Sequence, residues 1–322
     1  MKDLFKQKFS YTAKDLAENI NINSEEVIPA LVENNDFLSR IVIEDGIPAD
    51  SSKIVKLFDV DPELQEMTKC AFSDAGTVDF TQVTLTSKRV GIEILLCNNT
   101  LNNTWAQLLL RSGAKDSLET LPIEQQMLAL TRLKLEKKIQ DLIFKGDTGS
   151  GNSELAMFDG LIKKWKNDPA IPAFANAGAV SASNAYTIFK GVSRTVATEV
   201  RDNAIAGEII CSSVDFNHLV DDLMADNNFH YTANIQGTGN GRTLALPGTE
   251  DIVRVVPQLS TGEIYFVPYS YVMASTNVEG DLQGVYADFL VKERTLRLSG
   301  IMDIGINYAR PEYFAKYDEA AS

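Results

Sequence analysis

One stretch decides the fold of this chain: PIEQQMLALTRLKLEKKIQDLIFKGDTGSG, residues 122–151. Pro122 suits the first turn of a helix, and Lys145 suits the negative end of the helix dipole. Gly146 then ends the pattern. Segment 122–145 therefore predicts a helix of about 24 residues, which spans about 36 Å at a rise of 1.5 Å per residue. This is about twice the average helix length, so we expect the helix to organise the molecule around it.

The apolar residues of this helix fall on two faces rather than one. One face carries Ile123, Met127 and Leu130; the other carries Leu128, Leu135, Ile139 and Leu142. Two apolar faces indicate packing on two sides. The pattern fits a helix that crosses the middle of an ordinary domain, and it equally fits one that shares a surface with a neighbouring subunit.

Composition excludes several classes of protein. The chain carries 44 acidic against 30 basic side chains, a formal charge of −14, which disfavours a wide grip on nucleic acid but not its enclosure. We expect no membrane partner, because no apolar run approaches the roughly 20 residues that span a bilayer. The N-terminus has no apolar signal core. The odd, widely spaced Cys70, Cys97 and Cys211 fit a reducing cytoplasm.

Two strand-like runs precede the helix, at 53–60 and 80–96, and the second alternates apolar and polar residues. The polar segment 61–79 separates them. The whole of 52–91 therefore predicts a long excursion built on a hairpin. A lone two-stranded ribbon is marginal in water, so something outside the subunit must cover it if it projects.

The second half predicts a helix at 184–201, a strand at 208–211 and a helix at 215–225 with Asp215 as its cap. Short strands follow, at 252–256, 263–267, 284–292 and 301–308. Helices and strands are segregated rather than alternating, which indicates the α+β class.

No residue set indicates chemistry, so we expect no catalytic residue, no cofactor and no metal. The glycine-rich segments 146–151 and 237–241 lack the Gly-Lys-Ser/Thr of a phosphate loop. His218 and His230 are too few and too isolated for a metal site. Trp165, beside three lysines, could touch nucleic acid or an acidic partner, but a solvated loop end is the simpler interpretation.

Three passages carry a family resemblance: VTLTSKRVGIEILLCNNTLNNTW (83–105), LEKKIQDLIFKGDTGSG (135–151) with Asp159-Gly160-Leu161, and FLVKERTLRLSGIMDIGINYARPEYF (289–314). In their order they resemble the major capsid proteins of tailed bacteriophages, with the Hong Kong 97-like fold. They are similar to the return strand of that family's extended loop, to its spine helix and glycine-bearing stop, and to its closing strands.

The resemblance implies a division of the chain. It gives an N-terminal arm at 1–51, an extended β-hairpin loop at 52–91, a peripheral domain at 92–183 and 285–322 with spine helix 122–145, and an axial domain at 184–284. Only about 45 residues precede the loop, so scaffolding would be a separate protein or absent.

The resemblance also implies a structural protein rather than an enzyme. Copies would form the hexamers and pentamers of an icosahedral shell that encloses double-stranded DNA without sequence-specific binding, in a virion assembled in the bacterial cytoplasm. Portal and decoration proteins would be further partners. An extended loop lying across a neighbour would bring charged residues to inter-subunit contacts, and we expect these to be Lys53, Lys56, Lys88, Arg89 and Glu93.

Other interpretations stay open. The same fold builds encapsulin-like cellular compartments. A soluble α+β enzyme without a recognisable site is the alternative from another class, and a phage tail or connector component is a third.

Overall fold

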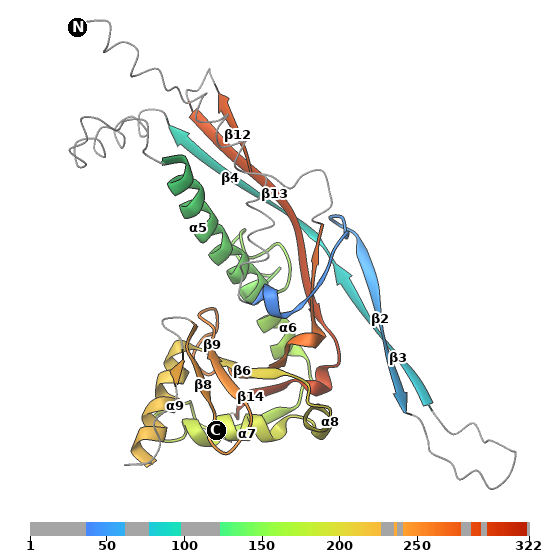
Figure 1. Cartoon of the computed structure of the whole chain (residues 1–322), viewed down its shortest axis with the longest axis vertical. Helices are drawn as coiled ribbons and strands as arrows, with labels where there is room; N and C mark the ends of the chain where they lie inside the picture. The colour runs from blue at the N-terminus through green and yellow to red at the C-terminus, as the bar shows by residue number, and fades with distance from the viewer. Residues whose placement is uncertain are drawn as a thin grey trace, which may run out of the picture.

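The computed structural model describes residues 37–61, 77–97, 123–226, 235–236, 241–277, 285–290 and 295–320. Helix α5 (Ile123–Lys145) runs beside a long sheet, and a two-stranded ribbon projects away from both (Figure 1). A second sheet with its own helices lies beyond the end of α5. The expected long helix is therefore confirmed. Most of the expected arm (1–36), the middle of the expected loop (62–76) and His230 lie outside the described residues.

The long sheet is organised by β13 (Thr295–Tyr308), a strand of 14 residues. Along one edge it pairs first with β12 (Val285–Leu290) and then with β11 (Val272–Thr276), which in turn pairs with β1 (Val42–Glu44). Its other edge pairs with β4 (Lys88–Cys97). A single strand thus pairs with three others, and through β11 it also aligns β1 from the start of the described chain.

The inward face of β13 packs against α5. Met302, Ile304 and Ile306 alternate along the strand and are buried in one core with the C-terminal half of the helix. Within that half, the expected apolar face is confirmed by the burial of Leu135, Ile139 and Leu142. The side chains of the other expected face lie outside those that the structure describes.

The second sheet has seven strands in the order β5-β14-β10-β6-β9-β8-β7. Their bounds are β5 Ala173–Ala177, β6 Gly207–Cys211, β7 Ile235–Gln236, β8 Thr243–Ala245, β9 Ile252–Val255, β10 Tyr265–Pro268 and β14 Ala315–Ala320. Helices α7 (Ala185–Thr195) and α9 (Ser213–Asp226) pack on it through Phe189 and Phe216.

The central strands of this sheet are buried on both faces. On β10, Phe266 points into the core under α7 and α9, whereas Tyr265 and Val267 point into the core shared with α5. On β6, Ile209 and Ile210 divide in the same way. The sheet therefore separates two cores, which explains why β6 is a continuous apolar run rather than an alternating one.

Trp165 lies where the two bodies meet, on the short helix α6 (Leu161–Asn167). Its indole is fully buried and contacts rings from α5, β10, β13 and the segment before β14: Phe144, Tyr265, Tyr308 and Phe314. The expectation of a solvated loop end at Trp165 is wrong. Its partners come from distant parts of the chain, so local sequence gave no signal of its burial.

The expected single strand 80–96 is two strands, β3 (Thr77–Thr86) and β4. They separate at Ser87, whose N–H donates to the Ser51 carbonyl at 3.1 Å and whose carbonyl accepts from the N–H of Asp50 at 2.9 Å. At Ser87 these two bonds take the place of the strand-to-strand hydrogen bonds that β3 makes with β2 (Ser52–Asp61) and β4 makes with β13. The chain then leaves its partner β2 and joins β13.

The expected helix 184–201 also divides, into α7 and α8 (Thr198–Asp202). Val196 and Ala197 adopt extended backbone, and the Arg201 guanidinium reaches back to the Ser193 carbonyl at 2.7 Å. That bond satisfies a carbonyl at the end of α7.

The expected cap of α9 is likewise one turn out of place. Ser212 rather than Asp215 caps it, because the Asp215 N–H donates to the Ser212 hydroxyl at 3.1 Å.

Sheet pairing crosses the expected domain ranges. Strands β5 and β14 come from the ranges assigned to the peripheral domain, yet they pair within the seven-stranded sheet. Strand β11 comes from the axial range, yet it pairs with β13. Range boundaries drawn from a linear pattern miss this exchange, because pairing partners are set by contacts distant in sequence.

Replacing Trp165 by alanine tests the junction. Loss of a fully buried indole should lower the free energy of unfolding by about 3–5 kcal/mol, measured by urea denaturation. Lys166→Ala, on the exposed side of the same helix, should change it by no more than about 0.5 kcal/mol. A Trp165→Ala loss as small as that of the control would contradict the assigned packing.

Candidate functional site

The surface that best fits a role in assembly is the projecting ribbon of β2 and β3. Its ladder is continuous from Ser52↔Thr86 to Asp61↔Thr77, and among the described residues these two strands form a sheet of their own. In Figure 1 the ribbon leaves the sheet that contains β13 and extends past the seven-stranded body without lying on it. One face of the ribbon, the inner face, packs on the body at its root, and the opposite, outer face is exposed.

The inner face is anchored at the root of the ribbon. Val83 and Leu85 are buried together with Met273 of β11, and Val55 and Leu57 pack at the edge of this cluster. This small core fixes the first part of the ribbon to the body.

The outer face is exposed and carries large apolar side chains beside the polar Lys56, Gln82 and Thr84. Phe58 and Phe80 are opposite each other in the ladder, with ring centroids 5.2 Å apart in an edge-on contact, and their exposed fractions are 64% and 60%. Ile54 and Val78 on the same face are 55% and 51% exposed. Large exposed apolar side chains gathered on one surface mark a site of interaction. The sequence carried a signal for this face, because β2 has apolar residues on both of its faces. Val55 and Leu57 lie on the inner face, and Ile54 and Phe58 lie on the outer face.

Four of the five expected inter-subunit charges have partners within the chain. Lys53 pairs with Glu44 at 2.7 Å, Lys88 with Asp50 at 2.5 Å, Arg89 with Asp303 at 3.0 Å, and Glu93 with Arg297 at 2.8 Å. Lys56 is exposed on the outer face of the ribbon, two residues from Phe58, with no ion-pair partner among the described residues. The structure thus brings the five onto the ribbon and β4 but not into one cluster.

The turn that follows α5 is closed by two glycines. The Gly160 N–H donates to the Gly146 carbonyl at 2.8 Å. A side chain at Gly160 would lie only 2.7 Å from the Ile143 and Phe144 carbonyls, and one at Gly146 would overlap the Phe158 carbonyl. The glycines therefore let the end of α5 and the start of α6 meet backbone to backbone.

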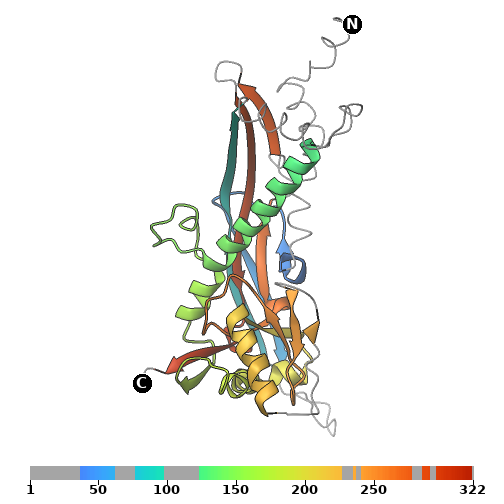
Figure 2. The same ribbon diagram turned by 90° about the vertical axis from the view of Figure 1, so that its left-hand side faces the viewer.

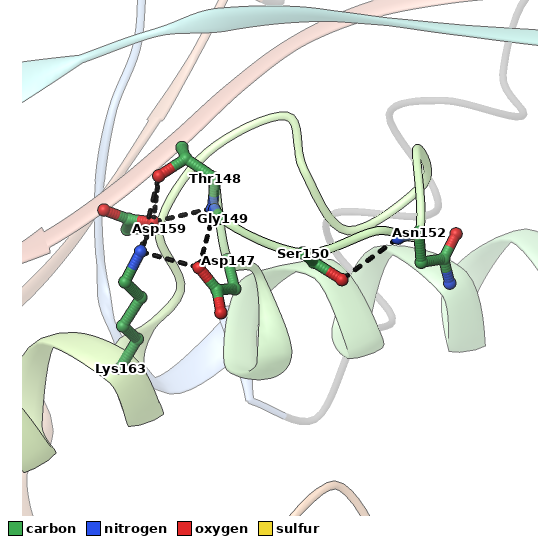
Figure 3. Close-up of polar contacts among 7 residues, drawn as sticks. All are labelled: Asp147, Thr148, Gly149, Ser150, Asn152, Asp159 and Lys163. Atoms are coloured by element: carbon green, nitrogen blue, oxygen red, sulfur yellow. Dashed lines mark hydrogen bonds and ion pairs between the residues drawn. The ribbon is translucent and has the colours of Figure 1, made fainter.

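Between these glycines the chain forms a loop that stands out from the body (Figure 2) and is tied by one lysine (Figure 3). Lys163 Nζ lies 2.7 Å from Asp147 and 2.6 Å from Asp159. Asp159 also accepts from the Thr148 N–H at 2.8 Å. The hydrogen bond from Lys163 is the main cause that lowers the pKa of Asp159 to about 2, and it also lowers the pKa of Asp147. A loop lined by carboxylates repels phosphate, so it is a structural turn.

Within the described residues, no group of three or more His, Cys, Asp or Glu side chains could hold a metal ion. His218 is half-buried on α9, in keeping with its expected place on a helix face. None of the helices in the described ranges is both long and apolar enough to cross a membrane.

Comparison with known proteins gives matches in structure but not in sequence. Neither a protein-family model nor a curated protein matches this sequence. A chain of the satellite phage P4 procapsid is 10% identical with a TM-score of 0.54, over 92% of this chain and 98% of that one. A chain of the capsid of an empty GTA particle is 12% identical with a TM-score of 0.57, over 89% and 90%. A chain of a virus-like particle from Pyrococcus furiosus is 10% identical with a TM-score of 0.51, over 94% of this chain and 98% of that one.

The chain has the Hong Kong 97-like capsid fold. The match extends over nearly the whole of each chain, so the mixed α+β architecture expected from the order of the sequence elements is confirmed. At 10–12% identity few side chains are shared. The Hong Kong 97-like likeness is therefore one of element order and packing.

The Lys163 cluster predicts a pH-dependent contribution to stability. Since Asp159 has a folded pKa of about 2 against an ordinary 3.8, its stabilisation is present above pH 3.8 and is lost as the pH falls through 2. Asp159→Asn should lower the free energy of unfolding by about 1 kcal/mol at pH 7, the upper end for a partly exposed pair. Urea denaturation of both proteins between pH 7 and pH 2.5 should show the difference shrinking below pH 3.8; a difference constant with pH would contradict this.

Proposed function

We propose that this chain is the major capsid protein of a tailed bacteriophage, a structural subunit that assembles with copies of itself into an icosahedral shell around double-stranded DNA. The observation that carries the proposal is the apolar outer face of the ribbon in a chain with the Hong Kong 97-like fold. The proposal extends to hexamers and pentamers, and to a virion assembled in the bacterial cytoplasm with scaffolding, portal and decoration proteins as further partners.

The energetics of the ribbon support assembly through many weak contacts. Fully burying a large apolar side chain contributes about 1.5–3 kcal/mol, so covering the exposed parts of these four residues of the outer face contributes about 3–7 kcal/mol. Association of two proteins costs about 4–15 kcal/mol in lost freedom of motion. One ribbon contact therefore gives at best a marginal dimer. A closed particle, in which every subunit both gives and receives a ribbon, would be stable.

In this proposal the parts of the chain take the roles that the resemblance implies. Residues 1–51 form the arm and 52–91 the extended loop. The sheet of β13 with α5 as the spine helix forms the peripheral domain, and the seven-stranded sheet with α7 and α9 forms the axial domain. Of the five charged residues, Lys56 is best placed to contact a neighbour, because it is exposed beside Phe58.

The net charge of −14 supports enclosure of DNA rather than tight adhesion to it. Phosphate contacts need lysine and arginine in excess. We therefore propose that the shell holds the genome without sequence-specific binding.

An encapsulin-like cellular compartment is the second candidate, favoured by the likeness to the virus-like particle from Pyrococcus furiosus over 94% of this chain. The contents of purified particles distinguish the two, since a capsid gives nucleic acid and a compartment gives protein cargo. Size-exclusion chromatography with negative-stain microscopy separates both from the remaining alternatives. A compact active monomer indicates an enzyme, and tubes or single rings indicate a tail or connector component.

Charge placed on the outer face of the ribbon tests the proposal. The double variant Phe58→Asp, Phe80→Asp should remain a folded, soluble subunit, because both rings are already more than half exposed. It should form no closed particles, because a neighbour would have to bury two unpaired carboxylates. Negative-stain microscopy and light scattering measure the outcome.

The matched control, Phe58→Tyr with Phe80→Tyr, keeps both rings and should assemble like the wild-type chain. Undiminished assembly of the aspartate variant would show that this face is not an inter-subunit contact. Absence of particles from the wild-type chain itself would contradict the proposed function.

A further inference from the structure

The root of the ribbon rests on one face of β13. Asp303, Gly305 and Asn307 alternate along this strand, so they share the face opposite to Ile304 and Ile306, which are buried in the core with α5. Each of the three residues meets a different part of the chain that enters or leaves the ribbon.

Asp303 holds the two ends of the ribbon together. Its side chain is 5% exposed, and its carboxylate accepts from Arg89 at 3.0 and 3.3 Å and from the Ala49 N–H at 3.1 Å. Ala49 comes just before β2, and Arg89 comes just after β3. Asn277, after β11, donates to the same carboxylate at 3.2 Å. The bond from Arg89 is the main cause that lowers the pKa of Asp303. One carboxylate thus joins the entry and exit segments to the sheet.

Gly305 and Asn307 hold β3 itself. The Thr86 carbonyl lies against Gly305 so closely that a side chain there would overlap it. Asn307 Nδ2 donates to the Thr84 carbonyl at 2.8 Å. On its other side, Asn307 Oδ1 accepts from Lys164 at 3.4 Å, and Lys164 also donates to the Ile306 carbonyl at 2.5 Å. The amide of Asn307 therefore links α6 to the ribbon.

We infer that Asp303, Gly305 and Asn307 are positioning residues that fix the direction of the ribbon in the isolated subunit, before a second copy binds. The four apolar side chains of the outer face are more than half exposed, whereas these three residues make their contacts at the root of the ribbon. A preformed direction removes part of the ordering cost of binding. That this direction also sets the geometry of the shell rests on the proposed function.

The inference is tested by measuring the direction of the ribbon in unassembled subunits. Nitroxide labels are attached to cysteines that replace Lys56 on β2 and Lys137 on α5, two exposed positions. Cys70 and Cys97 are replaced by serine in this protein, and Cys211 is kept because it is buried. Pulsed electron resonance gives the distance distribution between them, at a concentration where light scattering reports monomers. The reference protein should give one narrow distribution.

The sharpest variant is Asn307→Asp. It keeps the shape of the side chain, but replaces the donor to the Thr84 carbonyl by a second acceptor, while the bond from Lys164 remains. Asp303→Asn is the second variant, and it removes the charge that Arg89 contacts. Both should broaden and shift the distribution while the subunit stays folded, which urea denaturation reports. Asp303→Asn should also lower the urea midpoint, because it removes the charge of a nearly buried ion pair. Lys88→Ala is the matched control, because it removes an exposed ion pair with Asp50 at the same root and should leave the distribution narrow.

The outcomes separate the two proposals. An unchanged distribution in Asn307→Asp and Asp303→Asn, or equal broadening in Lys88→Ala, would overturn the positioning role. Broadened distributions with particles of altered or mixed diameter would support both the role and its place in assembly. Broadened distributions in the two variants, together with a wild-type chain that never assembles, would support the positioning role and contradict the proposed function.

Discussion

A ribbon of two strands has two faces, and its own subunit can cover only one of them. In this protein the inner face is anchored through Leu85 and Val83 to the body, and the outer face presents Phe58 and Phe80 to water. A third strand or a helix could have covered it within the chain, but the sheet of β2 and β3 contains no other strand among the described residues. Exposed aromatic pairs on a projecting element are costly unless a partner covers them. This constraint connects the fold to self-assembly.

The rest of the structure gives the ribbon a rigid base. Strand β13 aligns β4, β11 and β12 and presents one face to α5 and the opposite face to the ribbon root. Trp165 then joins this sheet to the seven-stranded sheet, because its neighbours come from α5, β10 and β13. The base of the ribbon is therefore built from sheet ladders and packed side chains. A base of packed strands and rings would suit the proposed capsid subunit, which would meet several neighbours at defined angles.

Local patterns in the sequence predicted the elements that depend on local interactions. The long helix, its end at Gly146 and the strands of the ribbon follow from periodicity and from glycine, and the order of elements carried the resemblance to the capsid fold. The patterns failed where distant contacts decide. Ser87 interrupts a continuous apolar alternation only because residues 50–51 bond to it, and Trp165 is buried only because four segments converge on it.

The charged residues expected at inter-subunit contacts and the exposed apolar residues of the ribbon are different sets, and the role of the charged residues in contacts stays a prediction. Charged residues of β2 and β4 were expected at the contacts, and one of them, Arg89 on β4, is bound to Asp303 within the chain. The cross-strand pair of Phe58 and Phe80 was missed, because the alternation within each strand fits several registers and does not by itself place the two rings opposite each other.

The central claim is that another copy of the chain covers the outer face of the ribbon. An electron cryomicroscopy reconstruction of purified wild-type particles, at a resolution that shows side chains, tests it most directly. The account predicts closed shells in which Phe58 and Phe80 of every subunit are packed against a neighbouring copy. Particles in which this face remains open to solvent, or a preparation that contains only monomers, would contradict it.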